Sequence, residues 1–291
     1  MAFTDDKTPL VAPFITSLLA AAAARPTAPR PLIVGLNGLQ GVGKTTLVTA
    51  LATALSTTHR TLVLSIDDFY LRHDAQLALA ASRPSNPLIQ NRGEPSTHDL
   101  PLARAVFADL AAGRETRVPR YDKAAFSGRG DRLPESEWLV ANAPGDPPVE
   151  IVILEGWCVG FRALEPGALR EKWEGESLTL RHHSLENLAF VNDALRDYDA
   201  LTDMFDAFVH IDAEDLTYVY AWRREQEVKL REDRGTGMSD EQVVRFVDGY
   251  FPAYELYVEG VRNGVLGKGR EGRQLRLVVG KDRKVKEKFV I

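Results

Sequence analysis

The chain contains a single cysteine, Cys158, and no apolar run that approaches the length of a membrane span. One cysteine excludes an internal disulfide and is typical of a reducing compartment. Basic residues form no long block, and the formal net charge is −5. The composition therefore favours neither a nucleic-acid partner nor a membrane partner, and an anionic ligand would have to be held by a few local basic side chains.

The amino-terminal segment also lacks the basic region that begins a secretory signal. Residues 17–24 are rich in alanine, and we interpret them as a helix before the first strand, with a targeting peptide as the alternative. We expect a cytoplasmic protein. With 291 residues, 44% of them hydrophobic, the chain is long enough to bury a full core. We expect one α/β domain over residues 1–291, with residues 1–30 as a helical extension.

Apolar segments typical of buried strands recur at wide spacing, with helical patterns between them. This alternation predicts a mostly parallel sheet that is covered by helices on both faces. Long polar, turn-rich stretches fall within residues 72–148, and long loops in a compact domain are usually functional. We therefore expect substrate-loop insertions there. The strands are expected at residues 31–37, 61–66, 149–154, 206–212 and 273–279.

Residues 38–45 fit the phosphate-binding pattern G-x-x-x-x-G-K-[ST] of a P-loop. Glycine lets the backbone turn around a phosphate, and successive N–H groups then form an anion nest that a helix N-terminus closes. Lys44 would reach the β- and γ-phosphates of ATP, and Thr45 would ligate Mg²⁺. The alternative is a Gly-rich turn that binds nothing. The residues expected to bind the nucleotide are Gly38, Leu39, Gln40, Gly41, Val42, Gly43, Lys44, Thr45 and Thr46.

Carboxylates follow the second and third predicted strands. Asp67 and Asp68 come directly after the second strand, and strand ends of this kind face the ligand crevice in open α/β sheets. Asp67 is therefore placed to accept a proton from a substrate hydroxyl, although both residues would also suit a turn or a helix cap. Glu155 ends the third strand in a Walker-B arrangement, and we expect it beside Mg²⁺ together with Thr45.

Two polar stretches, residues 91–99 and 118–132, are predicted to form substrate loops. They carry basic side chains that can pair with a carboxylate or a phosphate, and the alternative is solvated surface charge. A metal site at His182-His183 is not expected, because adjacent residues of a strand face opposite sides and no third histidine or cysteine lies nearby. The residues expected to touch substrate are Arg92, His98, Arg120, Tyr121, Lys123 and Arg129, with Arg132 in the same stretch.

These motifs occur in the order seen in the phosphoribulokinase, uridine kinase and pantothenate kinase superfamily, which the chain resembles. In detail it is similar to one branch, the D-glycerate 3-kinases of plants and their fungal ATP-dependent kinase relatives. The lack of a plant-like transit peptide favours a cytosolic fungal-type member. The resemblance covers roughly residues 30–280 and depends on Asp67-Asp68-Phe69-Tyr70, Arg92-Gly93 with His98-Asp99, residues 120–123, 128–132 and 155–157, Val191-Asn192, and residues 222–227 and 237–254.

The resemblance implies a P-loop kinase fold with a mobile lid in residues 214–237. After the lid, Ser239 and Gln242 have the spacing of a capping box and predict the start of a further helix. Within the lid, Arg223 and Arg224 are candidates to contact the transferring phosphoryl group, with a solvated helix face as the alternative.

It further implies an ATP- and Mg²⁺-dependent enzyme that converts D-glycerate to 3-phosphoglycerate, with Lys44, Asp67, Glu155 and Arg223 as catalytic residues. We expect a monomer that acts on a small anionic hydroxy acid. The alternatives are a kinase of a nucleoside, pantothenate or a sugar phosphate, or a non-catalytic ATP-binding regulatory protein. The excess of basic over aromatic residues in the loops argues against a nucleoside, and Asp67 argues against a purely regulatory protein.

Overall fold

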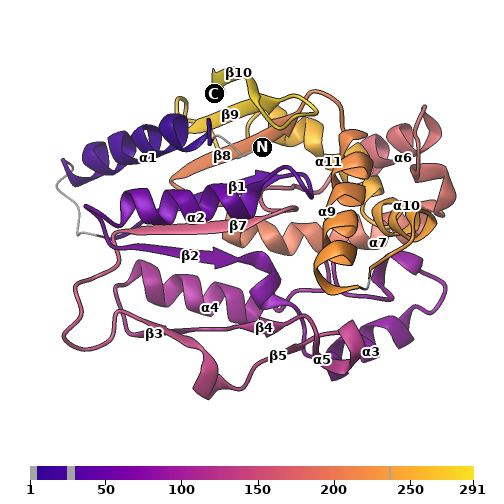
Figure 1. The fold of residues 1–291 in the computed structure, drawn as a ribbon, viewed down its shortest axis with the longest axis horizontal. Coiled ribbons are helices and arrows are strands. Elements are labelled where there is room, and N and C mark those ends of the chain that lie inside the picture. Colours follow the sequence, from indigo (N-terminus) through magenta and orange to yellow (C-terminus); the bar gives the residue numbers. More distant parts are fainter. Residues whose placement is uncertain (1–4, 25–29, 236) are drawn as a thin grey trace.

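The computed structural model describes residues 5–24, 30–235 and 237–291, together with their side chains except that of Arg234. Its centre is a six-stranded sheet with the strand order β10-β9-β8-β1-β7-β2 (Figure 1). Five of these strands are parallel, as the spacing of the apolar segments predicted. They are β1 (Leu32–Gly38), β2 (Thr61–Ser65), β7 (Ile151–Gly156), β8 (Ala207–Ala213) and β9 (Gln274–Val279).

The sixth strand, β10 (Val285–Val290), was not predicted. It pairs antiparallel with β9 at the edge of the sheet, with an irregular register between Val285 and Glu287. Most of its side chains are exposed, so its sequence lacks the continuous apolar run that marks the inner strands. All seven residues of β1 and of β8 are buried, in contrast, because helices cover both faces of the sheet there.

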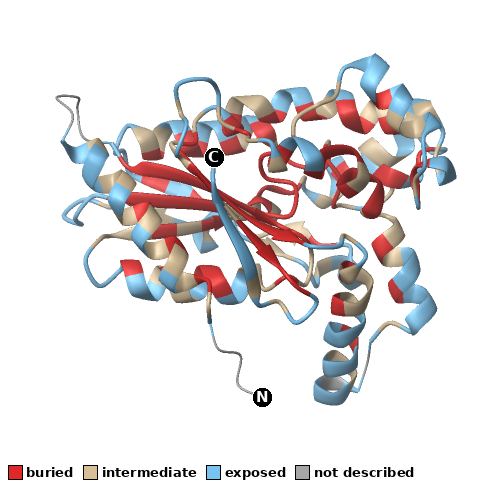
Figure 2. Ribbon diagram, turned by 90° about the horizontal axis from the view of Figure 1, so that it is seen from above, coloured by how far each residue is buried: buried red, intermediate tan, exposed pale blue. Residues whose placement is uncertain are grey.

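Helices form one layer on each side of the buried strands (Figure 2). On one side, α1 (Thr8–Ala23) packs against α2 (Lys44–Leu55), β1 and β8, and α2 also contacts β2 and β7. Val11 and Ile15 of α1 are fully buried, so the amino-terminal helix is part of the core. It begins well before the predicted residues 17–24. Of the expected extension 1–30, residues 1–4 and 25–29 lie outside the described part of the chain.

The crossovers after β2, β7 and β8 run in the opposite direction across the sheet, and right-handed connections therefore place their helices on the other side. In this layer α11 packs against β8, and α4 packs against α8. The helices of these crossovers include α4 (Leu100–Ala111), α6 (Pro166–Glu174), α7 (Leu185–Leu195), α8 (Asp199–Thr202) and α11 (Phe251–Arg262).

The segment 72–148 contains more regular structure than its polar composition predicted. The structure has helix α3 (His73–Ser82), the short turn α5 (Ala125–Gly128) and two small antiparallel sheets besides α4. Strands this short bury few side chains, so they leave no alternating pattern in the sequence. The two sheets pair β3 (Thr116–Val118) with β6 (Leu139–Ala141), and β4 (Tyr121–Asp122) with β5 (Asp131–Arg132).

Two further helices, α9 (Tyr218–Arg234) and α10 (Asp240–Asp248), project from the body of the molecule (Figure 2). The predicted capping box is present at the start of α10, where the Ser239 side chain accepts from the Gln242 N–H and the Gln242 side chain accepts from the Ser239 N–H. Thr236, within the predicted lid, lies outside the described residues. Over the described ranges, we find no helix with the length and apolar character of a membrane span.

Candidate active site

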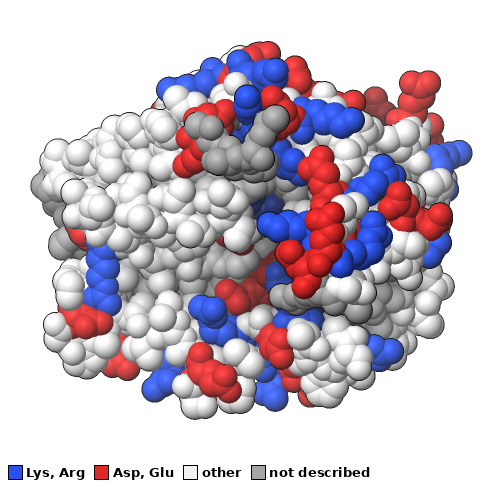
Figure 3. Space-filling view, viewed as in Figure 1, with Lys and Arg blue, Asp and Glu red and all other residues white. Residues whose placement is uncertain are grey.

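A cavity of about 1070 Å³ opens where the parallel strands β1, β2 and β7 end. The parallel register brings these ends together, because Leu36 of β1 and Ser65 of β2 both lie opposite Glu155 of β7. Figure 3 shows a hollow near the middle of this face, with acidic and basic side chains gathered around it. Elements from distant parts of the sequence line the cavity, including the P-loop, the turn after β2, the end of β7 and the start of α9.

The P-loop joins β1 to α2 and forms one wall of the cavity. Gly43 adopts φ 101° immediately before α2, and Gly41 adopts φ 80°, a conformation that L-residues rarely adopt. A Cβ at Gly41 would also lie 2.7 Å from the Trp222 side chain. The predicted cradle therefore has the backbone that requires glycine at these positions.

The side chains of the predicted nucleotide-binding set divide between the cavity and the core. Gln40, Gly41, Lys44 and Thr45 line the cavity, whereas Leu39 and Val42 are buried in the core. The residues that point into the core would contribute only backbone N–H groups. Lys44 Nζ donates to the carbonyl oxygens of Gly38, at 2.7 Å, and Leu39, at 3.1 Å. Burial lowers the pKa of Lys44, and the carboxylates of Glu155 and Asp67 oppose that shift.

Asp67 and Asp68 occupy the turn η1 (Ile66–Phe69) directly after β2, and the structure gives them different surroundings. Asp67 lines the cavity, and its Oδ2 accepts from Lys123 Nζ at 2.6 Å. Burial alone would raise the pKa of Asp67, but the charge and hydrogen bond of the Lys123 ammonium, together with a hydrogen bond from Tyr70, lower it on balance. Asp67 is therefore an ionised carboxylate that faces the P-loop.

Asp68 instead accepts from the backbone N–H of Tyr121 at 3.1 Å, and burial raises its pKa. This contact connects the turn after β2 to the second predicted substrate loop. The structure thus places one carboxylate at the cavity and uses the other to hold a loop.

Glu155 is the last residue but one of β7, and it lines the same cavity as Thr45, the other predicted metal ligand. Within the described ranges, no group of three or more His, Cys, Asp or Glu side chains is arranged to hold a metal ion. Mg²⁺ commonly binds through one or two carboxylates, with substrate phosphates and water completing its shell. A hydroxyl and one carboxylate beside a phosphate-binding loop fit Mg²⁺ better than a cation that needs a cage of protein ligands.

The six predicted substrate residues divide into two groups. Arg92, Lys123 and Arg129 line the cavity, whereas His98, Arg120 and Tyr121 are not part of its lining. The Tyr121 ring packs edge-on against Tyr70, at 5.4 Å between ring centroids. Arg120 is exposed.

Arg92 uses its guanidinium mainly to hold the loop that carries Lys123. It donates to the carbonyl oxygens of Gly128 at 2.7 Å and Lys123 at 3.3 Å, and also to that of Arg129. Its guanidinium lies 5.6 Å from the centre of the Tyr121 ring. Much of its hydrogen-bonding capacity is therefore directed at protein carbonyls.

His98 is packed inside the protein. Its Nδ1 lies 2.6 Å from the Tyr198 hydroxyl, and its ring stacks on Tyr70 at 4.5 Å. Burial lowers the pKa of His98 to about 4, against a weaker opposing effect of Asp67. His98 is consequently neutral near pH 7 and adds no positive charge for a carboxylate.

The predicted lid contributes one arginine to the cavity. Arg223 lines it, forms an ion pair with Glu227 and lies 4.5 Å above the Phe246 ring. Arg224 does not line the cavity and pairs with Asp240 of α10 at 3.1 Å. Glu227 also accepts from the Met238 N–H at 2.9 Å, so ion pairs and hydrogen bonds join α9 to the start of α10.

Several residues that line the cavity had no site role predicted from the sequence. They include Glu94, Trp157 and Tyr250, of which Trp157 and Tyr250 belong to motifs of the resemblance. Glu94 and Trp157 are only 3% and 4% exposed. A glutamate in a polar loop gives no sequence signal for burial. Gly93, beside it, does have a structural reason to be glycine, because it adopts φ 148° and a Cβ would lie 2.6 Å from the Tyr250 ring.

Comparison with known proteins identifies relatives of nearly the same length and fold. The uncharacterized kinase mug58 of Schizosaccharomyces pombe is 40% identical over 240 residues, which cover 81% of this chain and 84% of that protein. The structure of D-glycerate 3-kinase from Cryptococcus neoformans superimposes with a TM-score of 0.89 at 34% identity, covering 99% of this chain and 100% of that one.

The chloroplastic D-glycerate 3-kinase of Arabidopsis thaliana is 38% identical over 233 residues, which cover 78% of this chain. The match spans 48% of that protein, about half of its length. No protein-family model matches the chain. The identity and coverage of these relatives nevertheless show that the chain belongs to the family of D-glycerate 3-kinases and related fungal kinases in the P-loop kinase superfamily.

Proposed function

We propose that the protein is an ATP- and Mg²⁺-dependent kinase that phosphorylates the primary hydroxyl of D-glycerate to give 3-phosphoglycerate. The observation that carries the proposal is Asp67, an ionised carboxylate that lines the same cavity as Lys44 of the P-loop. A phosphate-binding loop alone would suit any nucleotide-binding protein. A carboxylate opposite it provides the base that a hydroxyl acceptor requires.

Lys44 and the N–H groups of the P-loop would hold the phosphates of ATP. The Lys44 ammonium group donates hydrogen bonds to two carbonyl oxygens of the loop, and a bound triphosphate would compete with these carbonyls for it. Thr45 and Glu155 would hold Mg²⁺, which when bound neutralises phosphate charge and polarises the transferring group. Arg223 of α9, which also lines the cavity, would approach the same charge.

Asp67 would accept the proton of the attacking hydroxyl. Its ion pair with Lys123 keeps it ionised, but Lys123 Nζ also lies 2.6 Å from the oxygen that must take the proton. The Lys123 side chain is 60% exposed, so it can move at low cost. We infer that it turns toward the acceptor carboxylate when the acceptor binds, which frees Asp67 Oδ2 for the hydroxyl.

Among the residues of the two substrate loops, Lys123 and Arg129 are the best candidates for the acceptor carboxylate. Both line the cavity, and Arg92 and His98 are less suited because one is bonded to loop carbonyls and the other is neutral. Residues 214–237 would act as the lid that excludes water from the γ-phosphate. The proposal also includes a single kinase domain, a monomeric state and a cytoplasmic location.

The activity can be tested by coupled ADP release with D-glycerate, glycerol, pantothenate and uridine as acceptors, together with identification of the phosphorylated product. We expect D-glycerate to be turned over with phosphate on its primary hydroxyl. Faster turnover of pantothenate or uridine than of D-glycerate would overturn the choice of acceptor. ATP binding with no turnover of any acceptor would instead favour a regulatory protein.

A further inference from the structure

Two deeply buried side chains among those that line the cavity each carry a polar atom without a hydrogen-bond partner. Glu94 is 3% exposed and Trp157 is 4% exposed, and both line the cavity. Neither Glu94 Oε1 nor Trp157 Nε1 has a hydrogen-bond partner anywhere in the described part of the protein. Buried polar atoms are nearly always paired in folded proteins. Gln40, His183 and Arg223 also line the cavity and carry an unpaired atom, but these residues are partly exposed. The deeply buried Glu94 and Trp157 are therefore the strongest candidates to pair with a ligand.

The two groups belong to the same end of the cavity. The Trp157 ring packs edge-on against Tyr250, at 5.1 Å between ring centroids. Tyr250 in turn packs against the backbone of Gly93, the residue before Glu94. The Glu94 carboxyl also raises the pKa of Tyr250, although burial of that tyrosine is the larger cause. Glu94 and Trp157 therefore approach Tyr250 from two different loops.

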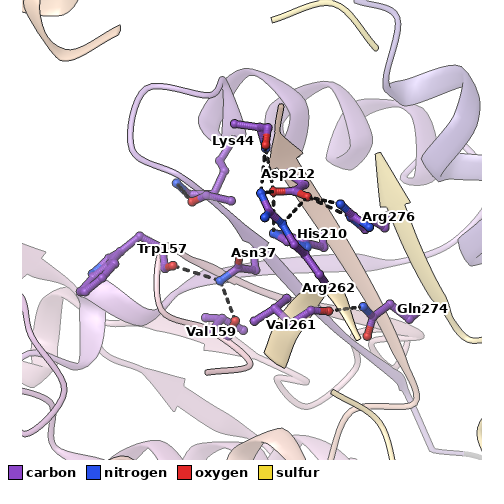
Figure 4. A network of polar contacts seen from close by, with 12 residues as sticks. Asn37, Lys44, Trp157, Val159, His210, Asp212, Val261, Arg262, Gln274 and Arg276 are labelled. Carbon is purple, nitrogen blue, oxygen red and sulfur yellow. Dashed lines mark hydrogen bonds and ion pairs between the residues drawn. The ribbon is translucent and has the colours of Figure 1, made fainter. Parts of the chain in front are cut away.

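Trp157 is held in a fixed position by a buried side chain of β1. Asn37 Nδ2 donates to the carbonyl oxygens of Trp157 at 3.0 Å and of Val159 at 2.8 Å (Figure 4). Trp157 also follows Glu155 by two residues, so the turn that presents its ring begins at the predicted metal ligand. Edge-on contacts with Phe161, Tyr250 and Tyr254 hold the ring itself. The indole N–H is therefore a preorganised donor on a residue that lines the cavity.

The pair has the hydrogen-bonding character of a hydroxyl-binding site. An indole N–H only donates, and a carboxyl oxygen accepts, whereas an alcohol hydroxyl does both. A hydroxyl placed between them would accept from Trp157 Nε1 and donate to Glu94 Oε1. Burial raises the pKa of Glu94 well above its usual range. The uncharged carboxyl would not repel an anionic acceptor or the triphosphate.

We propose that Glu94 and Trp157 bind the acceptor hydroxyl that is not phosphorylated, and that they determine specificity for acids with hydroxyls on adjacent carbons. This inference rests on the proposed function, because it assigns the 2-hydroxyl of D-glycerate to a site beside Asp67. Glu94 and Trp157 are specificity residues in this assignment, and neither takes part in proton transfer.

The test compares D-glycerate with 3-hydroxypropanoate, which has the same carboxylate and primary hydroxyl but lacks the 2-hydroxyl. A site built to bond a hydroxyl rejects an analogue without it by as much as about 10⁴-fold, because its polar groups are left unpaired. We therefore expect the wild-type protein to prefer D-glycerate in kcat/KM by at least about 10²-fold. The variants are Glu94→Leu, Glu94→Gln and Trp157→Phe.

Glu94→Leu and Trp157→Phe should lower kcat/KM for D-glycerate by about 10-fold or more and leave 3-hydroxypropanoate nearly unchanged, so that the preference shrinks. Glu94→Gln keeps a carbonyl acceptor and should retain most of the preference. Tyr257→Phe is the matched control. The Tyr257 hydroxyl is also buried without a partner among the described residues, but Tyr257 does not line the main cavity. It lines a smaller, mostly apolar cavity to which Glu94 also contributes.

Two outcomes would overturn the inference by showing that these residues have a structural role. In the first, Glu94→Leu lowers kcat/KM equally for both acceptors. In the second, the preference for D-glycerate survives in both Glu94→Leu and Trp157→Phe. The inference would also be overturned if Tyr257→Phe reduced the preference for D-glycerate as strongly as Glu94→Leu does. Thermal unfolding and ATP binding of each variant show whether it is folded. If Glu94→Leu does not fold, Glu94→Gln and Trp157→Phe still test the inference. If the wild-type protein turns over neither acid, the proposed function fails and this inference fails with it.

Discussion

Replacement of Asp67 by asparagine separates the chemical role of this residue from its structural one. The substitution keeps the shape of the side chain but removes its ability to accept a proton. Loss of a general base lowers turnover by about 10²–10⁴-fold, which corresponds to about 3–5 kcal/mol in the activation free energy. We expect that loss in kcat with D-glycerate, whereas ATP affinity should change little because Lys44 and the P-loop remain.

The structural cost of the same substitution should be much smaller. Asp67 pairs with Lys123, and their side chains are 24% and 60% exposed, respectively. Solvent therefore partly screens the pair, and its loss should cost about 1 kcal/mol. The expected loss of activity is therefore several times larger than the expected loss of stability, and the two can be measured separately by steady-state kinetics and urea unfolding.

The pH dependence of stability gives a second measurement on the same variant. The pKa of Asp67 is lower in the folded protein than its ordinary value. Its contribution to stability is therefore present above the unfolded pKa, near pH 4, and is lost as the pH falls through the folded pKa. Asp67→Asn should be less stable than the wild type at pH 7, and the difference should shrink in acid.

Asp68→Asn is the matched control, because Asp68 accepts from the Tyr121 N–H and does not line the cavity. Asparagine keeps a carbonyl oxygen that can accept from this N–H, so the substrate loop should stay in place and any effect should fall on KM for the acceptor and not on kcat. The reasoning would be refuted if Asp68→Asn lost 10²-fold or more in kcat while Asp67→Asn remained active. Folded Asp67→Asn with normal turnover would refute it as well.

Three further results are expected. Lys44→Ala should lower turnover by several orders of magnitude and preserve the fold, so a folded variant with near wild-type activity would show that the P-loop assignment is wrong. Glycerol should be a far poorer acceptor than D-glycerate because Lys123 and Arg129 would be left without a carboxylate, and equal rates for the two would exclude that role. Arg223→Ala should lower kcat with only modestly weaker ATP binding, whereas Arg224→Ala should have little effect; a silent Arg223→Ala would place the lid elsewhere, in the loops of residues 72–148.

The sequence predicted the scaffold of the site because the scaffold depends on short-range patterns. Parallel strands buried on both faces read as continuous apolar runs, and this located five strands of the sheet. Once their order along the chain is known, the P-loop, Asp67 and Glu155 must meet at the carboxyl edge. The edge strand β10 was not predicted because most of its side chains are exposed, so its sequence lacks an apolar run. It is a strand because it pairs with β9.

The roles of the basic residues were harder to predict, because a sequence gives the charge of a side chain and not the groups around it. Arg92 and Arg129 look equivalent in the sequence, yet Arg92 is bonded to three loop carbonyls. His98 looks like a cation for the acceptor, but burial keeps it neutral near pH 7. Glu94 shows the converse case, since a charged residue type in a polar loop becomes a buried, uncharged group at the cavity.

Arg92 connects the two predicted substrate loops. It is held beside the cavity by the loop of residues 91–99, and its bonds to the carbonyls of Lys123, Gly128 and Arg129 fix the second loop against the first. Lys123 therefore extends toward Asp67 from an anchored backbone, while its own side chain stays free to move. An arginine that never touched the substrate would still control catalysis in this arrangement, because it sets the distance from which Lys123 can reach either Asp67 or an acceptor carboxylate.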